Sequence, residues 1–345
     1  MKMVKLLAAA GIVMAICSDA HAEKITPFMF SIYPKEYLQM PDSDYSVYGL
    51  HLAPGIGFAK NVYGLDIGGV SSKEELMGIQ IGGVSGFASS VSGVQVGGLF
   101  AGATNGVSGV QVGGIRSVAL NGVSGVQVGG ILSGASGVSG VQVGGLSAVA
   151  TNSVTGVQVG GVASSAEEIS GIQVGGLFAV ATNSVSGVQV GGVACAEEIA
   201  GLQVGGLLAV TGNSVSGVQV GGVADAEEIS GIQVGGLFAY TKETLGIQIA
   251  GLMAASKEMS GIQAGFSSLA KEVTFGVQLG VINKAEMRGG IQIGPVNIAD
   301  AIAVIQIGFV NYANKQSDNC IQIGFVNWLG ANDTLKALPF FNCRF

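Results

Sequence analysis

The pentapeptide Gly93-Val94-Gln95-Val96-Gly97 decides the fold, because it returns with little change along most of the chain. The next copy, at residues 109–113, is identical, and most others keep the form Gly-aliphatic-Gln-aliphatic-Gly. The central position recurs at steps of fourteen to sixteen residues, a period that indicates a repeat architecture. Its nineteen occupants form a predicted structural ladder: His51, Asp66, Gln80, Gln95, Gln111, Gln127, Gln142, Gln158, Gln173, Gln189, Gln203, Gln219, Gln233, Gln248, Gln263, Gln278, Gln292, Gln306 and Gln322.

The pattern around each central position is that of a β-strand. The preceding residue is aliphatic in all nineteen copies and the following residue in eighteen, Ala264 being the exception. Alternation of period two places these aliphatic residues on one face and the central residue on the other. Glycine lies two residues before and two residues after the centre in seventeen copies each, which indicates positive φ or a backbone with no room for Cβ. The sequence therefore predicts an all-β protein.

Two all-β architectures fit this period. In a β-solenoid, or β-roll, each unit of about fifteen residues is one coil, and coils stack in parallel at about 4.8 Å. The aliphatic residues beside each Gln would fill the interior, and the Gly-Gly pairs would turn the corner. In an up-and-down outer-membrane β-barrel, each repeat would be one tilted strand, and Phe345 would end the closing strand. The paucity of charged and aromatic residues favours the solenoid, and the barrel stays the alternative.

The ends of the chain differ from the array. Residues 1–22 have two lysines, an apolar run and Ala20-His21-Ala22 before Glu23, a pattern typical of a secretory signal peptide. Residues 23–46 contain a short aromatic segment predicted as an N-terminal cap, and residues 47–330 are the tandem array. Residues 331–345 are predicted as a C-terminal aromatic cap or closing strand, because stacked units expose unpaired edges at their ends.

The later repeats resemble a known family. Gly290-Ile291-Gln292-Ile293-Gly294-Pro295-Val296-Asn297 is similar to the G-L-Q-I-G-x-V-N units of bacterial surface-repeat proteins, as are residues 305–311 and the VYGL segments at 47–50 and 62–65. This resemblance implies an exported envelope protein and supplies no catalytic residue. Residues 216–226 are partly similar to the coils of trimeric autotransporter adhesin heads, which are β-rolls.

Composition narrows the function. The net charge is −7 with only 15 Lys and Arg, which argues against a nucleic-acid partner. After the predicted signal peptide His51 is the only histidine, so no catalytic, metal or cofactor-binding residue is assigned and none of these groups is expected. Cys195, Cys320 and Cys343 allow one disulfide at most, for which Cys320 with Cys343 is the best pair. The acidic pairs that begin at Glu167, Glu197 and Glu227 could bind calcium, but their spacing is more typical of a solvated turn.

We therefore expect a non-enzymatic protein that is exported to the outer membrane or cell surface. Its role would be structural or adhesin-like, and its partners would be the cell envelope or outer membrane and a surface ligand that the sequence does not name. The alternative function is that of an outer-membrane barrel, as a pore or a scaffold.

Overall fold

The computed structural model describes residues 23–32, 39–301, 303–314, 319–330 and 337–344, and side chains for these except Ala301. The described chain contains strands and turns and no helix, and its fold is a β-solenoid of coils about fifteen residues long. It divides into two compact units, the first ending at Val128 and the second spanning Gly129–Phe345. The predicted signal peptide at residues 1–22 lies outside the described residues.

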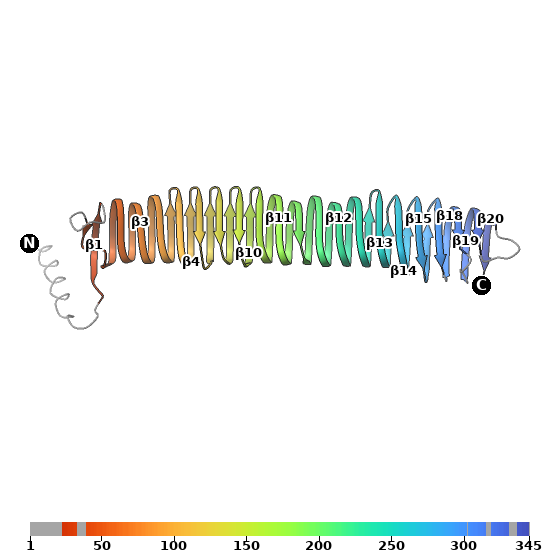
Figure 1. Ribbon diagram of the computed structural model, residues 1–345, viewed down its shortest axis with the longest axis horizontal. Coiled ribbons are helices and arrows are strands. Elements are labelled where there is room, and N and C mark those ends of the chain that lie inside the picture. Colours follow the sequence, from red (N-terminus) through yellow and green to blue (C-terminus); the bar gives the residue numbers. More distant parts are fainter. Residues whose placement is uncertain (1–22, 33–38, 302, 315–318, 331–336, 345) are drawn as a thin grey trace, which may run out of the picture. The chain divides into compact units, whose positions relative to one another are not determined.

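Long strands in this fold continue around corners and through several coils (Figure 1). The first unit contains β1 (Ile25–Ser31), β2 (Gln39–Met40), β3 (Ser46–Gly97), β4 (Phe100–Gly113), β5 (Arg116–Ala119) and all but the last residue of β6 (Val123–Gly129). The second contains β7 (Leu132–Ala135), β8 (Val138–Gly144), β9 (Ser147–Ala150), β10 (Ser153–Gly160), β11 (Ala163–Ala196), β12 (Glu198–Ala250), β13 (Met253–Ala264), β14 (Ser267–Leu279), β15 (Ile282–Met287), β16 (Gly290–Ile293), β17 (Val296–Ala301), β18 (Ala303–Ala313), β19 (Asn319–Leu329) and β20 (Ala337–Arg344).

Each coil pairs in parallel with the next, residue for residue. In the first unit Gln95 of β3 lies opposite Gln111 of β4. In the second unit Gln158 of β10 lies opposite Gln173 of β11, and the flanking residues keep the same register. Joining sequential repeats by parallel pairing excludes the barrel alternative, because an up-and-down barrel requires antiparallel neighbours. The pore or scaffold was predicted as the function of a barrel, and the fold is a β-solenoid instead.

A coil consists of two short walls that face each other across a narrow interior. The wall that carries the Gly-x-Gln-x-Gly motif, here called the motif wall, is followed by a bend, as at Gly161 and Val162, and then by the second wall. A polar corner, for example Thr151 and Asn152, leads to the next motif. Bends that begin at the second glycine of a Gly-Gly pair, as at Gly145 and Gly161, agree with the sequence-based prediction.

The motif glycines allow the backbones of successive coils to approach closely. Gly171 has φ +137°, and a Cβ built on it would lie 2.2 Å from the carbonyl oxygen of Gly156 in the preceding coil. The glycine two residues after Gln meets a different obstacle: a Cβ on Gly175 would lie 1.8 Å from the oxygen of Phe178 across the bend. At the glycine before Gln both predicted reasons hold, positive φ and lack of room for Cβ. At the glycine after Gln the reason is lack of room.

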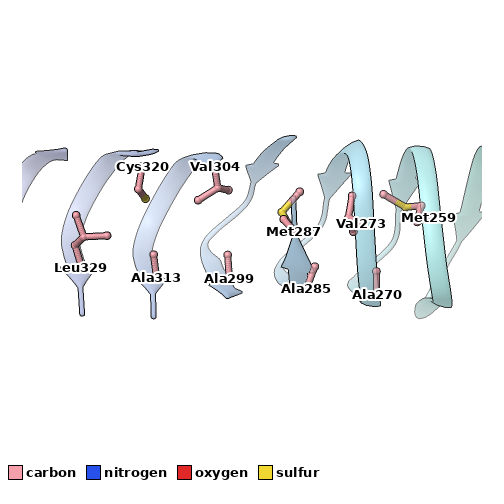
Figure 2. Close-up of a cluster of buried hydrophobic side chains, with 10 residues drawn as sticks. All are labelled: Met259, Ala270, Val273, Ala285, Met287, Ala299, Val304, Ala313, Cys320 and Leu329. Carbon is pink, nitrogen blue, oxygen red and sulfur yellow. The ribbon is translucent and has the colours of Figure 1, made fainter. Parts of the chain in front are cut away.

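The apolar part of the core pairs large residues with small ones. In the last coils Met259, Val273 and Met287 form a row from one wall, and Ala270 and Ala285 form the facing row (Figure 2). A narrow interior explains this pairing, since two large side chains would not fit between the walls. In the last pair the larger residue, Leu329, lies in the row of the alanines, and Cys320 lies in the opposite row.

Antiparallel strands lie at the two ends of the chain. In the first unit β1 continues the parallel stack, with Met29 opposite His51, and β2 pairs antiparallel with β1 through Phe30 and Met40. In the second unit β20 pairs antiparallel with β19, where Asn342 lies opposite Gln322. Each strand covers one edge of its neighbour that would otherwise remain unpaired.

Candidate functional site: a buried amide ladder and its charged N-terminal end

The ladder residues lie inside the solenoid, and the aliphatic residues beside them lie outside. All nineteen ladder side chains are fully buried. The flanking residues are partly exposed, as Ile172 shows beside Gln173. The expectation that these aliphatic residues fill the interior is therefore wrong. Period-two alternation separates two faces without saying which one is buried, and hydrophobicity alone pointed to the wrong face.

A ladder glutamine inside the array forms hydrogen bonds in two directions, whereas Oε1 of Gln322, the last one, has no hydrogen-bond partner among the described residues. Gln189 donates from Nε2 to Oε1 of Gln173 in the preceding coil at 2.9 Å and to the carbonyl oxygen of Cys195 at 2.9 Å. Its own Oε1 accepts from Nε2 of Gln203 in the following coil, also at 2.9 Å. Cys195 belongs to the second wall of the same coil, so one amide joins neighbouring coils and also the two walls. A carboxylate or an aliphatic side chain in this position would lack the donors.

The ladder has one direction within each unit. In the first unit Gln95, Gln111 and Gln127 each donate to the preceding ladder residue at 2.9 Å. In the second unit every glutamine from Gln158 to Gln322 donates to the preceding glutamine at 2.8–3.0 Å. Aligned hydrogen bonds in a low-dielectric interior polarise one another.

A second ladder of asparagines runs through the last coils in the opposite direction. Asn283 donates to Asn297, Asn297 to Asn311, and Asn311 to Asn327, at 2.9, 2.8 and 2.7 Å. All four are fully buried. Sequence reasoning missed this ladder, although the asparagine that follows each of the last motifs at a constant distance, after Ile or Val, was its signal.

Charged residues replace glutamine at the start of the ladder in the first unit. His51 Nδ1 lies 2.5 Å from Asp66 Oδ1, and Lys73 Nζ lies 3.5 Å from Asp66 Oδ2, with all three side chains fully buried. Gln80 donates to Asp66 Oδ2 at 2.9 Å, and Ser31 Oγ lies 3.1 Å from His51 Nε2. His51 and Asp66 were predicted as ladder positions, whereas Lys73 and Ser31 were not identified from the sequence.

The environment of this network sets its charge state. Burial lowers the pKa of His51 despite the nearby carboxylate, so the imidazole is neutral. Burial raises the pKa of Asp66, but the His51 hydrogen bond, the Lys73 charge and Gln80 together bring it below the usual value. Burial lowers the pKa of Lys73 to about 8. Lys73 Nζ lies 3.0 Å from His51 Nδ1 and 3.5 Å from Asp66 Oδ2, so the ammonium, the carboxylate and the ring nitrogen Nδ1 form one cluster, while Ser31 Oγ faces Nε2.

The Ser31, His51 and Asp66 side chains have the connectivity of a hydrolytic triad. Ser31 and His51 are fully buried, however, and Asp66 is also bonded to Lys73 and Gln80. The Ser31 hydroxyl is closed to solvent in this structure. The network therefore serves as the polar end of the ladder, where a carboxylate accepts the first glutamine donor.

A hollow of about 1070 Å³ opens on the surface of the first unit near this network. Its lining includes Glu23, Lys24, Asp44, Lys60 and Glu74, so charges of both signs face it. Asn61 donates to Glu23 at 2.9 Å and to Ser46 Oγ at 3.1 Å on its wall. Oδ1 of Asn61 has no hydrogen-bond partner among the described residues, and the lining charges of both signs select no class of ligand.

The remaining sequence candidates occupy separate places. Cys195, Cys320 and Cys343 are free thiols, so the suggested disulfide is absent from the structure. Cys320 is buried, while Cys343 lies opposite Ile321, whose side chain points outward, so the two thiols occupy opposite faces. Glu167, Glu197 and their equivalents are exposed on the polar corner. No group of three or more His, Cys, Asp or Glu residues in the described ranges is placed to hold a metal ion.

Fold and interior together define the class: a parallel β-solenoid with a continuous amide ladder in each unit. No family model, curated protein or solved structure matches the chain. None of the described segments is a helix long and apolar enough to cross a membrane.

Proposed function

We propose that the chain is an exported, non-enzymatic protein of the bacterial cell envelope whose role is structural or adhesin-like. The observation that supports this proposal is the hydrogen bonding inside the solenoid. The buried amides of the array form hydrogen bonds that join coil to coil, as Gln189 illustrates. The outside presents the same few residue types again and again, which suits a long repetitive surface more than a pocket.

The leader-like N-terminal segment supports export, and the resemblance to surface-repeat units supports an envelope location. A free ligand in the medium or on another cell would meet the polar corner, where Glu197 and Glu227 are exposed. An adhesin-like role would use this corner as the contact surface.

Export is tested by expressing the full chain in a bacterial host and determining the mass and N-terminus of the product. We expect cleavage after Ala22 and recovery in the envelope fraction. The matched control is Ala20→Arg with Ala22→Arg, which should abolish cleavage while leaving the array unchanged. An uncleaved wild-type chain that remains in the cytoplasm would contradict the proposal.

A further inference from the structure

The outer surface of the second unit is apolar on one side. The two residues that flank each ladder glutamine on the motif wall are aliphatic from Val141 and Val143 to Ile321 and Ile323, except for Ala264. The bend that follows carries another column of large apolar side chains. We call these columns together the apolar face; its bend column consists of Leu146, Val162, Leu177, Val193, Leu207, Val223, Leu237, Leu252, Phe266, Val281, Pro295, Phe309 and Phe325.

The bend column is exposed to an extent unusual for a soluble protein. Leu177, Leu207 and Leu237 are 57, 70 and 51% exposed. Phe309 and Phe325 stack on each other at 5.1 Å and point outward together. Exposed large apolar residues recur along this face from Leu146 to Phe325, whereas the largest apolar patch on a typical monomer covers only ~300–600 Å².

Charges are kept away from the apolar face. In the second unit Glu167, Glu197, Glu227 and Lys242 lie on the polar corner, at the opposite end of the coil from the bend. Among the described residues of this unit neither the flanking columns nor the bend column contains a charged side chain. The coil is therefore amphipathic, with one apolar and one charged edge.

The backbone behind the apolar face needs no water. Parallel ladders pair the motif walls of successive coils, as between Gln158 and Gln173. Inside, glutamine amides donate to carbonyl oxygens of the second wall, as Gln173 does to Val180 at 3.0 Å. A surface with its polar groups paired internally and aliphatic side chains outward meets the requirement for contact with hydrocarbon.

The shape of the apolar face distinguishes lipid from a second copy of the chain. The flanking columns project from the motif wall, whereas the bend column projects from the narrow edge, so the apolar surface turns a corner. A flat wall of a second solenoid would cover one of these sides and leave the other in water. Hydrocarbon adapts to both sides at once, and the lack of cations on the face removes any attraction to anionic headgroups.

We propose that the apolar face of the second unit is a lipid-contacting surface, which lies in the interfacial layer of a neutral bilayer while the polar corner remains in water. The inference names the partner of the envelope protein proposed above and rests on that proposal only for the source of the membrane. Vesicle binding and export are separate measurements, so either can fail without the other.

The test is flotation of the folded full chain with phosphatidylcholine vesicles, with and without phosphatidylglycerol. The face variant is Leu177→Glu with Leu207→Glu and Leu237→Glu. The matched control is Thr151→Glu with Thr182→Glu and Asn213→Glu, which adds the same charge at the same spacing on the exposed polar corner. All three proteins keep the same N-terminal segment, so its contribution is constant, and circular dichroism verifies that each remains β-structured.

We expect wild type and the corner control to float with both kinds of vesicle, and the face variant to lose at least about tenfold in partition coefficient, because three charges would enter the interface. Equal flotation of the face variant and wild type would overturn the proposal. A second result would also overturn it: wild type does not bind vesicles and forms a discrete oligomer, whereas the face variant is monomeric. The apolar face would then contact a second copy of the chain. Should the face variant not fold, Leu207→Ser alone provides the same comparison, and undiminished binding would again overturn the proposal.

Discussion

Gln80 donates from Nε2 to Oδ2 of Asp66 at 2.9 Å, and this single bond sets the orientation of every later amide in the first unit. An ionised carboxylate only accepts hydrogen bonds, so Gln80 must turn its nitrogen toward Asp66. Its oxygen then faces Gln95, which donates to it at 2.9 Å. Gln111 and Gln127 have the same orientation, because each donates to the oxygen of the preceding glutamine. Reversing one amide would place two donors or two acceptors face to face.

Replacing one ladder glutamine should destabilise the protein more than loss of one hydrogen bond suggests. Gln189→Leu leaves Gln173 Oε1 without its donor and removes the acceptor of Gln203. Each buried polar group left unsatisfied costs about 1–3 kcal/mol, so we expect a loss of that size or more in the free energy of unfolding. Urea titration measures it. Val190→Thr, on the outer face of the same coil, is the control, and an equal loss in both variants would contradict the structural role of the ladder.

Alanine at a motif glycine should be poorly tolerated. In Gly187→Ala the new Cβ would lie 2.2 Å from the Gly171 carbonyl oxygen, at φ +135°. We expect destabilisation of at least about 1–3 kcal/mol from the strained backbone alone. Gly134→Ala is the matched control, because no atom lies within 4 Å of the Cβ there. Thermal unfolding of the two variants should therefore differ clearly, and similar midpoints would mean that the coils can separate at little cost.

The stability of the first unit should depend on pH through its buried charges. Because the pKa of His51 is lower in the folded protein than in the unfolded chain, the unfolded chain binds a proton at a higher pH. The free energy of unfolding therefore falls as the pH drops below 6.5. The pKa of Asp66 is also lower in the folded protein. The free energy of unfolding therefore falls further as the pH drops below 3.8 and through the pKa of the folded state. Lys73, with its pKa lowered to about 8, destabilises the folded state at neutral pH, and stability rises from about 8 toward 10.5.

A triple variant tests these assignments. His51→Gln with Asp66→Gln and Lys73→Ala would extend the glutamine ladder to the first coils and remove all three titrating groups. Replacing a buried ion pair by well-packed neutral residues is often neutral or stabilising, so we expect an equally stable protein with a flatter pH profile. Thermal midpoints measured across the pH range decide the matter. An unchanged profile would show that other groups carry the pH dependence.

Deletion of a whole coil should preserve the fold. Removal of residues 187–200 joins Ser186 to Gly201, which already lies in register with Gly187. Gln203 would then follow Gln173 in the ladder, so a shorter β-rich protein is expected. Removing residues 187–193, half of that coil, is the control. It should cause aggregation, because the second wall of one coil would then stack on the motif wall of its neighbour. Circular dichroism and sedimentation compare the two, and a soluble half-coil deletion beside an aggregated whole-coil deletion would refute the stacking register.

Periodicity was sufficient to predict the class of fold and the ladder positions, because equal spacing places equivalent residues in neighbouring coils. It did not show which face of the strand is buried. In an ordinary sheet aliphatic residues such as Val188 would lie inside, but here Gln189 does, since only an amide can join both walls and both neighbouring coils. Lys73 escaped notice because it stands where other coils have a small residue such as Ala103, and burial of a lysine depends on contacts that local sequence does not reveal. The overlooked Asn283 ladder is a different case, because its asparagines recur in the sequence at a constant distance from the ladder glutamines.

The one-way alignment of the glutamine amides has an electrical consequence. Each side-chain amide is a dipole with its nitrogen toward the preceding coil, so the series in the first unit presents its positive end to the Asp66 carboxylate, much as a helix N-terminus favours an anion. In the last coils of the second unit the asparagine dipoles from Asn283 to Asn327 oppose those of the glutamines. The field of the glutamine series is therefore partly cancelled in those coils, whereas in the first unit it acts undiminished on a buried anion.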